Sequence, residues 1–291
     1  MQFIHDFLLY EWVIYSLVGL AALCLAAREA FIRKYRGHPG IMLHTHFNNL
    51  IIALPFALFV TPPKLITIYF LAGASIAYGL ATLIKFKLYE THDLGAVYPT
   101  LRALSLLCTV VLGTFLLGDK LHLGQWVGVT IMSVAIFAMH YRQRDGLSMT
   151  KAAFILSIIA ACGYAALNTL EAFAVRSSAE QFFSFIVYGY IIRSAAIAGL
   201  TYVTHHKRKL WAFYRNEFIP CLVPLGLLTI SYVSMMWAYL HGNFNIATVI
   251  MESKIAAGVL IGIVFLGEAA NTRRLVCTAF VILGVLLVKI Y

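Results

Sequence analysis

Charged residues are scarce in this chain. Asp, Glu, Lys and Arg together make up 12% of its 291 residues, whereas 62% are hydrophobic. Soluble domains carry about 25% charged and about 45–50% apolar residues. A water-soluble fold would leave too much apolar surface exposed, so the composition excludes soluble enzymes and nucleic-acid-binding proteins. The 14% of aromatic residues also exclude a disordered chain.

Long polar segments are lacking as well. A membrane-spanning helix needs about 20 mostly apolar residues. The sequence predicts ten such runs, at residues 12–32, 41–60, 65–86, 94–117, 122–141, 152–175, 182–204, 218–240, 244–267 and 272–290. The runs are continuously apolar, without the alternation of barrel strands, which favours helices. We therefore expect an all-α integral membrane protein with ten transmembrane helices and no separate soluble domain.

Acidic residues number 12 against 22 basic ones, which gives a net charge of +10. Most of the Lys and Arg residues lie in or beside the gaps after the first, third, fifth, seventh and ninth runs. Such clustering encodes membrane topology and does not indicate nucleic-acid binding. The positive-inside rule places these gaps in the cytoplasm and both chain termini on the other side of the membrane.

Cysteines and catalytic motifs give no sign of metal or covalent chemistry. The five cysteines lie within apolar runs without paired spacing, so we expect buried apolar residues and not disulfides or metal ligands. His44 and His46 are two positions apart and point to different helix faces, which excludes a shared metal. The sequence contains no nucleophile elbow, phosphate loop or zinc motif. These absences predict that the protein is not an enzyme and has no cofactor, while proton or ion coupling stays open.

The two halves of the chain resemble each other. A shift of 142 residues aligns Glu29-Ala30-Phe31 with Glu171-Ala172-Phe173. A shift of 149 residues aligns the fourth run with the ninth, pairing His92 with His241, Gly113 with Gly262 and Asp119 with Glu268. The order of the matches predicts two five-helix repeats, at residues 1–145 and 146–291. An odd number of helices in each repeat forces opposite orientations, the inverted-repeat architecture of secondary transporters, which bind substrate near the membrane midplane.

The fourth and ninth runs carry motifs of a known family. The segment Tyr98-Pro-Thr-Leu-Arg-Ala-Leu-Ser105, followed by Leu116-Leu-Gly-Asp119, resembles the fourth-helix signature of EamA-type proteins of the drug/metabolite transporter superfamily. Val264-Phe-Leu-Gly-Glu268 resembles the same signature in the second repeat. Leu106 and Ile255 stand where the family often has proline. Lys254 replaces a commonly acidic or small residue.

This resemblance implies two five-helix repeats and a carrier, often an exporter, of small metabolites. It also implies a central cavity partly lined by the fourth and ninth helices. Better-known relatives keep both termini in the cytoplasm, against the charge count, so orientation stays open.

Ionisable residues inside the runs are the candidate binding residues, because each is costly in hydrocarbon without a partner, water or function. Tyr98, Arg102, Ser105 and Thr109 share one face of the fourth helix. The repeat places Lys254 on the equivalent face of the ninth helix. Two converging cations favour a carboxylate or phosphate, which arginine binds bidentately and lysine as a point charge. The alternative is that each is a structural residue paired with a glutamate.

Five further residues complete the candidate set. Glu252 lies two positions from Lys254, so on a regular helix the two would not face each other. It is expected to pair with Arg102 or Arg193, or to bind a substrate amine. Arg193 is expected either to bind substrate or to pair with Glu171 or Glu252.

Asn168 and Glu171 share a stripe with Tyr164 on the sixth helix. Glu171 and its repeat counterpart Glu29 should lie near opposite membrane faces. There they would serve in gating or proton coupling, or else be solvated helix-end carboxylates.

The sequence thus predicts a secondary transporter in the cytoplasmic (inner) membrane. It would move a small polar metabolite by alternating access, with export as the expected direction. The expected partners are the substrate and the lipid bilayer, not nucleic acid, and the oligomeric state is open. A carboxylate- or phosphate-bearing substrate, or a zwitterion such as an amino acid, is favoured over a cationic or quaternary amine. Alternatives outside transport are a lipid-modifying membrane enzyme and a non-transporting scaffold.

Overall fold

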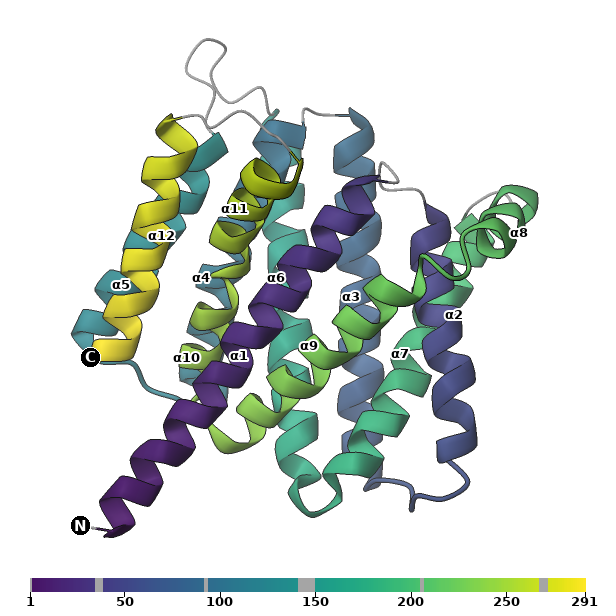
Figure 1. Cartoon of the computed structure of the whole chain (residues 1–291), viewed down its shortest axis with the longest axis horizontal. Coiled ribbons are helices and arrows are strands. Elements are labelled where there is room, and N and C mark those ends of the chain that lie inside the picture. Colours follow the sequence, from purple (N-terminus) through teal and green to yellow (C-terminus); the bar gives the residue numbers. More distant parts are fainter. Residues whose placement is uncertain (1, 35–38, 92–93, 141–149, 205–206, 267–271) are drawn as a thin grey trace.

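The computed structural model describes residues 2–34, 39–91, 94–140, 150–204, 207–266 and 272–291. All secondary structure in these ranges is helical, which confirms the all-α prediction (Figure 1). Six segments are long and apolar enough to cross a membrane: Glu11–Phe31, Leu65–Lys85, Lys151–Ser177, Ala179–Val203, Leu222–His241 and Phe244–Val264. The chain is therefore a multi-pass helical membrane protein.

Each expected apolar run contains one helix, except that the run at 244–267 contains two. The first half holds α1 (Gln2–Lys34), α2 (Pro39–Phe56), α3 (Leu65–Thr91), α4 (Leu94–Leu116) and α5 (Leu123–His140). The second half holds α6 (Lys151–Ser177), η1 (Ala179–Gln181), α7 (Phe182–Thr204), α8 (Lys207–Asn216), α9 (Leu222–His241), α10 (Phe244–Met251), α11 (Lys254–Leu266) and α12 (Thr272–Ile290). Helix α8 was not expected.

The ninth apolar run is interrupted between α10 and α11. Asn243 caps the start of α10, where its side chain accepts a hydrogen bond of 3.1 Å from the Ile246 N–H. The helix ends at Met251, residues 252–253 form a turn, and α11 begins at Lys254. Figure 1 shows this break about halfway between the two faces of the bundle.

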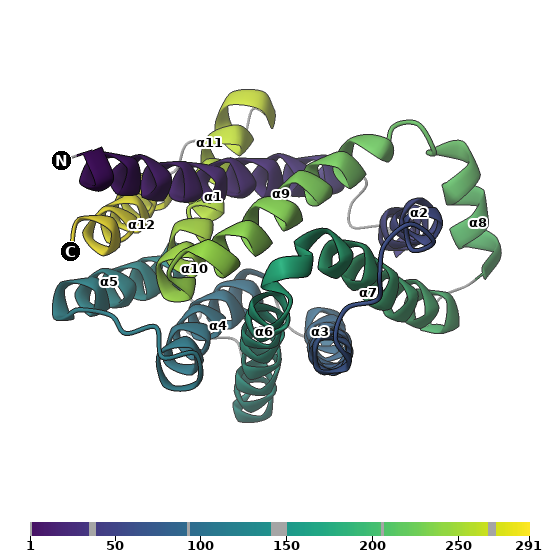
Figure 2. The same cartoon turned by 90° about the horizontal axis from the view of Figure 1, so that it is seen from below.

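The helices form two layers, seen best by comparing Figures 1 and 2. Helices α1 and α9 cross in front of α3, α4 and α6. The α5–α12 pair closes one end of the bundle, and α2, α7 and α8 close the other. Ala160, Ala161 and Ala165 of α6 are fully buried, and such small side chains allow neighbouring helices to approach closely.

Two groups of buried apolar side chains hold the layers together. One joins α1, α7, α9 and α10 and includes Val18, Phe185 and Tyr239. The other joins α4, α5, α11 and α12 and includes Val110 and Met132. Many outward-facing side chains on the helices are also apolar, as expected for a surface in contact with lipid.

The helices run alternately up and down, so α1 begins and α12 ends at the same face of the bundle (Figure 1). We call this the termini face. The end of α4 and the turn between α9 and α10 also lie at this face, whereas α8 lies at the opposite face.

Candidate functional site

The break between α10 and α11 brings Glu252 and Lys254 into direct contact. The Lys254 Nζ lies 2.6 Å from the Glu252 Oε1, and the two side chains are only 13% and 11% exposed. The expectation that these residues would not face each other is wrong. It assumed a continuous helix, whereas the turn at residues 252–253 lets both side chains point to the same place.

Arg102 of α4 adds a second cation to this pair. It interacts electrostatically with both Glu252 and Lys254 across the packed α4–α10 contact. Ser105 and Thr109, on the same stripe of α4, are buried, and the Thr109 hydroxyl donates a 2.7 Å hydrogen bond to the Ser105 carbonyl. The stripe thus faces the protein interior at these positions. The Tyr98 side chain lies outside the described residues.

Helix α6 contributes a tyrosine to the same region. Tyr164 lies in the electrostatic environment of Arg102, and its hydroxyl is 3.4 Å from the Thr82 hydroxyl of α3. Asn168, one helical turn further along α6, is half-buried. Tyr164 of the predicted stripe on the sixth helix thus lies within electrostatic reach of Arg102.

The chemistry of this first cluster suits a ligand with both an anionic and a donor group. Arg102 and Lys254 place two cations beside the Glu252 carboxylate, and Glu29 also interacts electrostatically with Lys254. The Glu252 Oε2 is buried and has no hydrogen-bond partner among the described residues. A buried oxygen of this kind is costly unless something donates to it. A Cβ added to Gly258, one turn beyond Lys254, would meet no atom within 4 Å.

A second ionisable cluster centres on Arg193 of α7. Arg193 forms an ion pair with Glu171 of α6, as one of the sequence alternatives predicted. Its guanidinium lies 4.4 Å from the ring centroid of Tyr232, which in turn packs edge-on against Tyr190. Glu171 is buried, so it is not a solvated helix-end carboxylate.

Two residues that sequence reasoning missed connect the clusters. Arg28 of α1 is buried and pairs with Glu29 at 3.2 Å, while the Glu29 side chain stays 52% exposed. Glu29 interacts electrostatically with Lys254. His46 of α2 is buried and interacts with both Arg28 and Arg193.

Ionisable side chains thus run from the first cluster to the second. The sequence could have pointed to Arg28, because it is a charged residue inside an apolar run.

A third polar cluster closes the termini face. Arg176, at the end of α6, binds Asp119 bidentately, with distances of 3.2 Å and 2.7 Å. The Arg176 Nε also donates to the Tyr239 carbonyl at 3.0 Å, and the Phe244 N–H donates to Asp119 at 2.6 Å. We call this the Asp119–Arg176 clasp. Sequence reasoning treated both residues as loop charges, although Asp119 ends the family-like motif.

The cysteine prediction is wrong in part. Cys24, Cys221 and Cys277 are buried, as expected, but Cys162 is exposed. Its sulfur lies 3.8 Å from that of Cys108, so α4 and α6 place two free thiols side by side. Within the described ranges, no group of three or more His, Cys, Asp or Glu side chains is arranged to hold a metal ion.

Comparisons with known proteins identify the fold and no family. No protein-family model matches the chain. No curated protein matches it either. A crystal structure of another protein is similar with a TM-score of 0.70 at 15% sequence identity, over 95% of this chain and 96% of the other. At this identity the likeness shows a shared fold alone.

Proposed function

We propose that the protein is a secondary transporter that moves a small polar metabolite by alternating access. The observation that carries this proposal is the broken helix α10–α11, with Glu252, Lys254 and Arg102 gathered at the break. Transporters typically build their binding sites near the midplane from discontinuous helices, whose free ends and unwound backbone contact the substrate.

The packing pattern supports an inverted repeat. Let α1, α2, α3, α4 and α5 correspond to α6, α7, α9, α10–α11 and α12. The contact of α3 with α6 then corresponds to that of α9 with α1, and the contact of α4 with α6 corresponds to that of α11 with α1. The pairs α2–α7 and α5–α12 join counterparts directly.

Corresponding helices run in opposite directions in Figure 1. We therefore infer two inverted repeats, residues 1–145 and 146–291, and membership of the drug/metabolite transporter superfamily.

The proposed substrate is a zwitterion of amino-acid type. Its carboxylate, or a phosphate in its place, would bind Arg102 and Lys254, with Ser105 close by on α4. Its ammonium group would donate to the Glu252 Oε2, which otherwise lacks a partner among the described residues. A purely cationic substrate is disfavoured because Arg102 and Lys254 lie beside the Glu252 carboxylate that would have to bind it.

The other polar clusters supply candidate moving parts. Alternating access requires one face to open while the other closes, with the ligand binding the two states differently. The Asp119–Arg176 clasp links α6, the loop after α4 and the turn after α9, so its rupture would open the termini face. Glu171, buried against Arg193, is the proposed coupling carboxylate. Glu29 connects Arg28 to the substrate cluster.

Ligand-dependent thermal stability tests the site. Purified protein is screened with carboxylates, phosphates, amino acids and amines. A ligand at about 100 times its dissociation constant stabilises the folded state by about 2.7 kcal/mol. We expect amino acids to stabilise the wild type, and Lys254→Ala or Arg102→Ala to abolish the effect. Lys151→Ala, which removes an exposed lysine at the start of α6, is the matched control. Stabilisation by amines alone, or stabilisation that survives in both variants, would overturn the assignment.

Reconstitution separates transport from the other classes. A carrier moves labelled substrate only across a sealed vesicle, whereas a membrane enzyme turns over in detergent. A scaffold would tolerate Arg102→Ala combined with Lys254→Ala in every assay. Uptake into right-side-out and inside-out vesicles of the cytoplasmic membrane would report whether the direction is export.

A further inference from the structure

Helix α8 lies outside the helical bundle at the face opposite the chain termini. Figures 1 and 2 both show it at the periphery, beside α2 and the upper end of α7. Its sequence, KRKLWAFYRN, combines three basic residues at its start, aromatic residues in its middle and Arg215 near its end. Short helices that are both basic and aromatic typically lie in the membrane interface.

The aromatic residues of α8 anchor it to α2. The Tyr214 ring lies 4.9 Å from the His44 ring, and Phe47 makes edge contacts with Trp211 and Tyr214 at 5.7 Å and 5.8 Å. The Tyr214 hydroxyl donates a 2.8 Å hydrogen bond to Asn48. Burial raises the pKa of Tyr214 further above its ordinary value. These contacts hold α8 at a defined height on the bundle.

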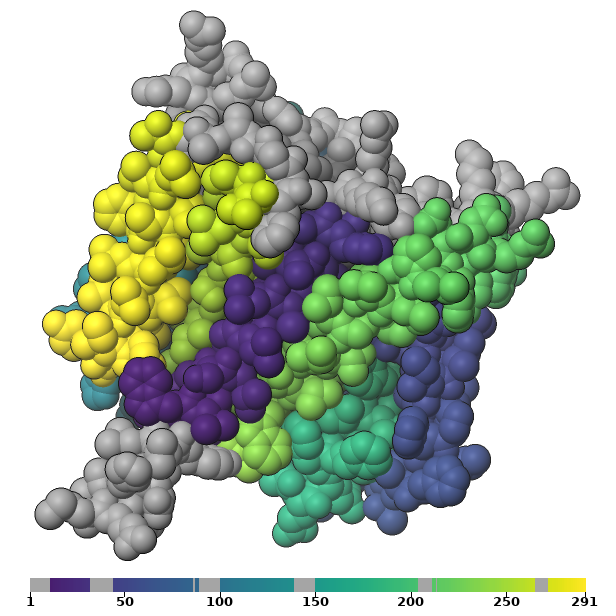
Figure 3. Space-filling view, in the orientation of Figure 1, coloured from purple at the N-terminus to yellow at the C-terminus, as the bar shows by residue number. Residues whose placement is uncertain are grey.

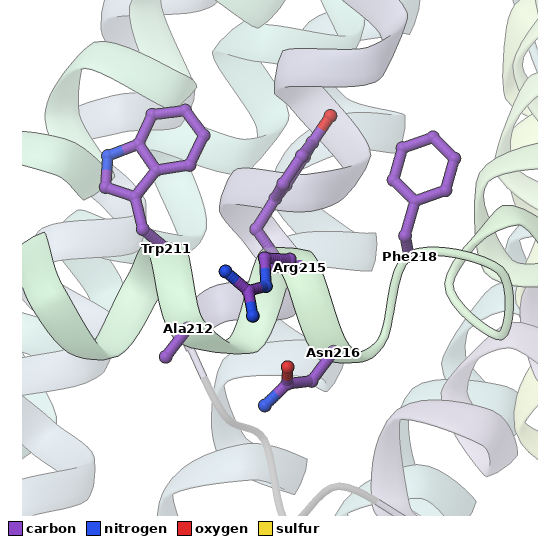
Figure 4. Close-up of a pocket in the computed structure, with 6 residues that line it drawn as sticks. Trp211, Ala212, Arg215, Asn216 and Phe218 are labelled. Atoms are coloured by element: carbon purple, nitrogen blue, oxygen red, sulfur yellow. The ribbon is translucent and has the colours of Figure 1, made fainter.

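An open groove of about 720 Å³ lies along α8. It is lined by Trp211, Ala212, Tyr214, Arg215, Asn216 and Phe218. In Figure 4 the Trp211 and Phe218 rings project to one side, while the Arg215 guanidinium and the Asn216 amide lie on the other. The lining of the groove therefore has an apolar side and a polar side.

The surroundings of the groove indicate what occupies it. Trp211, Arg215 and Asn216 are exposed, and the neighbouring Ile219 is 76% exposed. In Figure 3 the pale green surface of this region overhangs the blue surface of α2, which faces outward beside it. Because the chain is a membrane protein, lipid lies against this outward apolar surface. The nearby guanidinium then sits where a phospholipid carries its phosphate.

We propose that this groove binds the headgroup of an anionic phospholipid. Arg215 donates two parallel hydrogen bonds to the lipid phosphate, a geometry that guanidinium groups favour, and the Asn216 amide donates another. Trp211 and Phe218 pack against the glycerol and the upper part of the acyl chains, the depth at which aromatic residues are enriched in membrane proteins. The basic start of α8 adds attraction to anionic lipid, as polybasic segments beside a membrane do. This site is independent of the transport proposal.

Fluorescence quenching tests the site in the intact protein. Trp12, Trp126 and Trp237 are replaced by phenylalanine so that Trp211 is the reporter. The protein is then placed in bilayer discs of phosphatidylcholine containing brominated phosphatidylglycerol or brominated phosphatidylcholine. We expect stronger quenching by the anionic lipid. Arg215→Gln should weaken its apparent affinity about tenfold, as loss of a charge-assisted contact predicts.

Two controls keep the outcomes distinct. Lys151→Gln removes an exposed basic residue far from α8 and should leave quenching unchanged. Asn216→Ala should weaken binding less than Arg215→Gln, and the melting temperature of each variant shows that it folds. Equal quenching by the two lipids would overturn the proposal. So would complete displacement of the anionic lipid by inorganic phosphate, because the groove would then bind a free ion.

Discussion

Three carboxylates of this protein each form an ion pair with a basic side chain: Asp119 with Arg176, Glu171 with Arg193, and Glu252 with Lys254. All three carboxylates are largely shielded from solvent. Removing one partner from a buried pair is strongly destabilising, because the other charge is left uncompensated. The three pairs therefore constrain which helices can separate, and they do so in different parts of the bundle.

Glu171→Gln should lower the free energy of unfolding by about 3 kcal/mol, because Arg193 would keep its contact with the Tyr232 ring and lose its counter-ion. Chemical unfolding in detergent would measure the change. Glu180→Gln, at an exposed position in η1, serves as the control. Replacing both partners with Glu171→Gln and Arg193→Met should recover part of the loss. A loss in the double variant as large as the sum of the two single losses would refute a direct pairing.

Asp119→Asn should loosen the clasp at the termini face, because an amide cannot accept two charge-assisted hydrogen bonds from Arg176. In a cysteine-free background, Thr114→Cys, half-buried beside Asn245, reports access to the interior. We expect Asp119→Asn to increase its labelling by a membrane-impermeant maleimide. Lys120→Gln, at the exposed neighbouring position, should not. Unchanged labelling in Asp119→Asn would show that the clasp does not control access.

Among the elements, α5 and α12 bring their backbones close together at two glycines. A Cβ on Gly128 would lie 2.8 Å from the Gly284 carbonyl oxygen, and a Cβ on Gly284 would lie 2.7 Å from that of Gly128. Gly124 and Gly128 form a G-x-x-x-G motif, a common signature of close helix contacts in membranes. The absence of side chains at these positions is what lets the two backbones touch.

Gly128→Leu should therefore force α5 and α12 apart and destabilise the protein by about 1–3 kcal/mol, the usual cost of overpacking. Thermal unfolding in detergent would measure it. Gly199→Leu in α7 is the matched control, since a Cβ there meets no atom within 4 Å. Equal melting temperatures for the two variants would mean that the α5–α12 contact is not tightly packed.

The break in the ninth run shows where element prediction from hydropathy ends. Residues 244–267 include the polar triplet Glu252-Ser253-Lys254, but their mean hydropathy is high enough for the run to be read as one continuous span. Irregular backbone at membrane depth is tolerated only where protein or a cavity surrounds it. Here α1 and α4 pack around α10, so the turn at 252–253 is shielded from lipid. Whether a run can break thus depends on its neighbours, which a hydropathy window does not include.

At the scale of the whole molecule, α1 begins and α12 ends at the same face of the bundle (Figure 1), and the proposed ten-crossing topology would put both termini on one side of the membrane. Reporters fused to the two ends in separate fusions should therefore give the same compartment. An outside reading would agree with the distribution of Lys and Arg, and a cytoplasmic reading with the family resemblance. Opposite readings for the two ends would contradict the helix order in Figure 1. The same experiment would assign α8 to the other side.

Local properties of the chain were enough to predict a helical membrane protein, the approximate positions of its helices and the inward face of Arg102, Ser105 and Thr109. Composition and helical periodicity act over a few turns, so they can be read from neighbouring residues. These local properties could not predict which residues of distant segments are in contact.

The meeting of Glu252 with Lys254, the choice of Glu171 as the partner of Arg193, and the clasp of Asp119 with Arg176 all depend on packing. Hydropathy measures the preference of each segment for an apolar environment, and it does not specify which segments pack against each other.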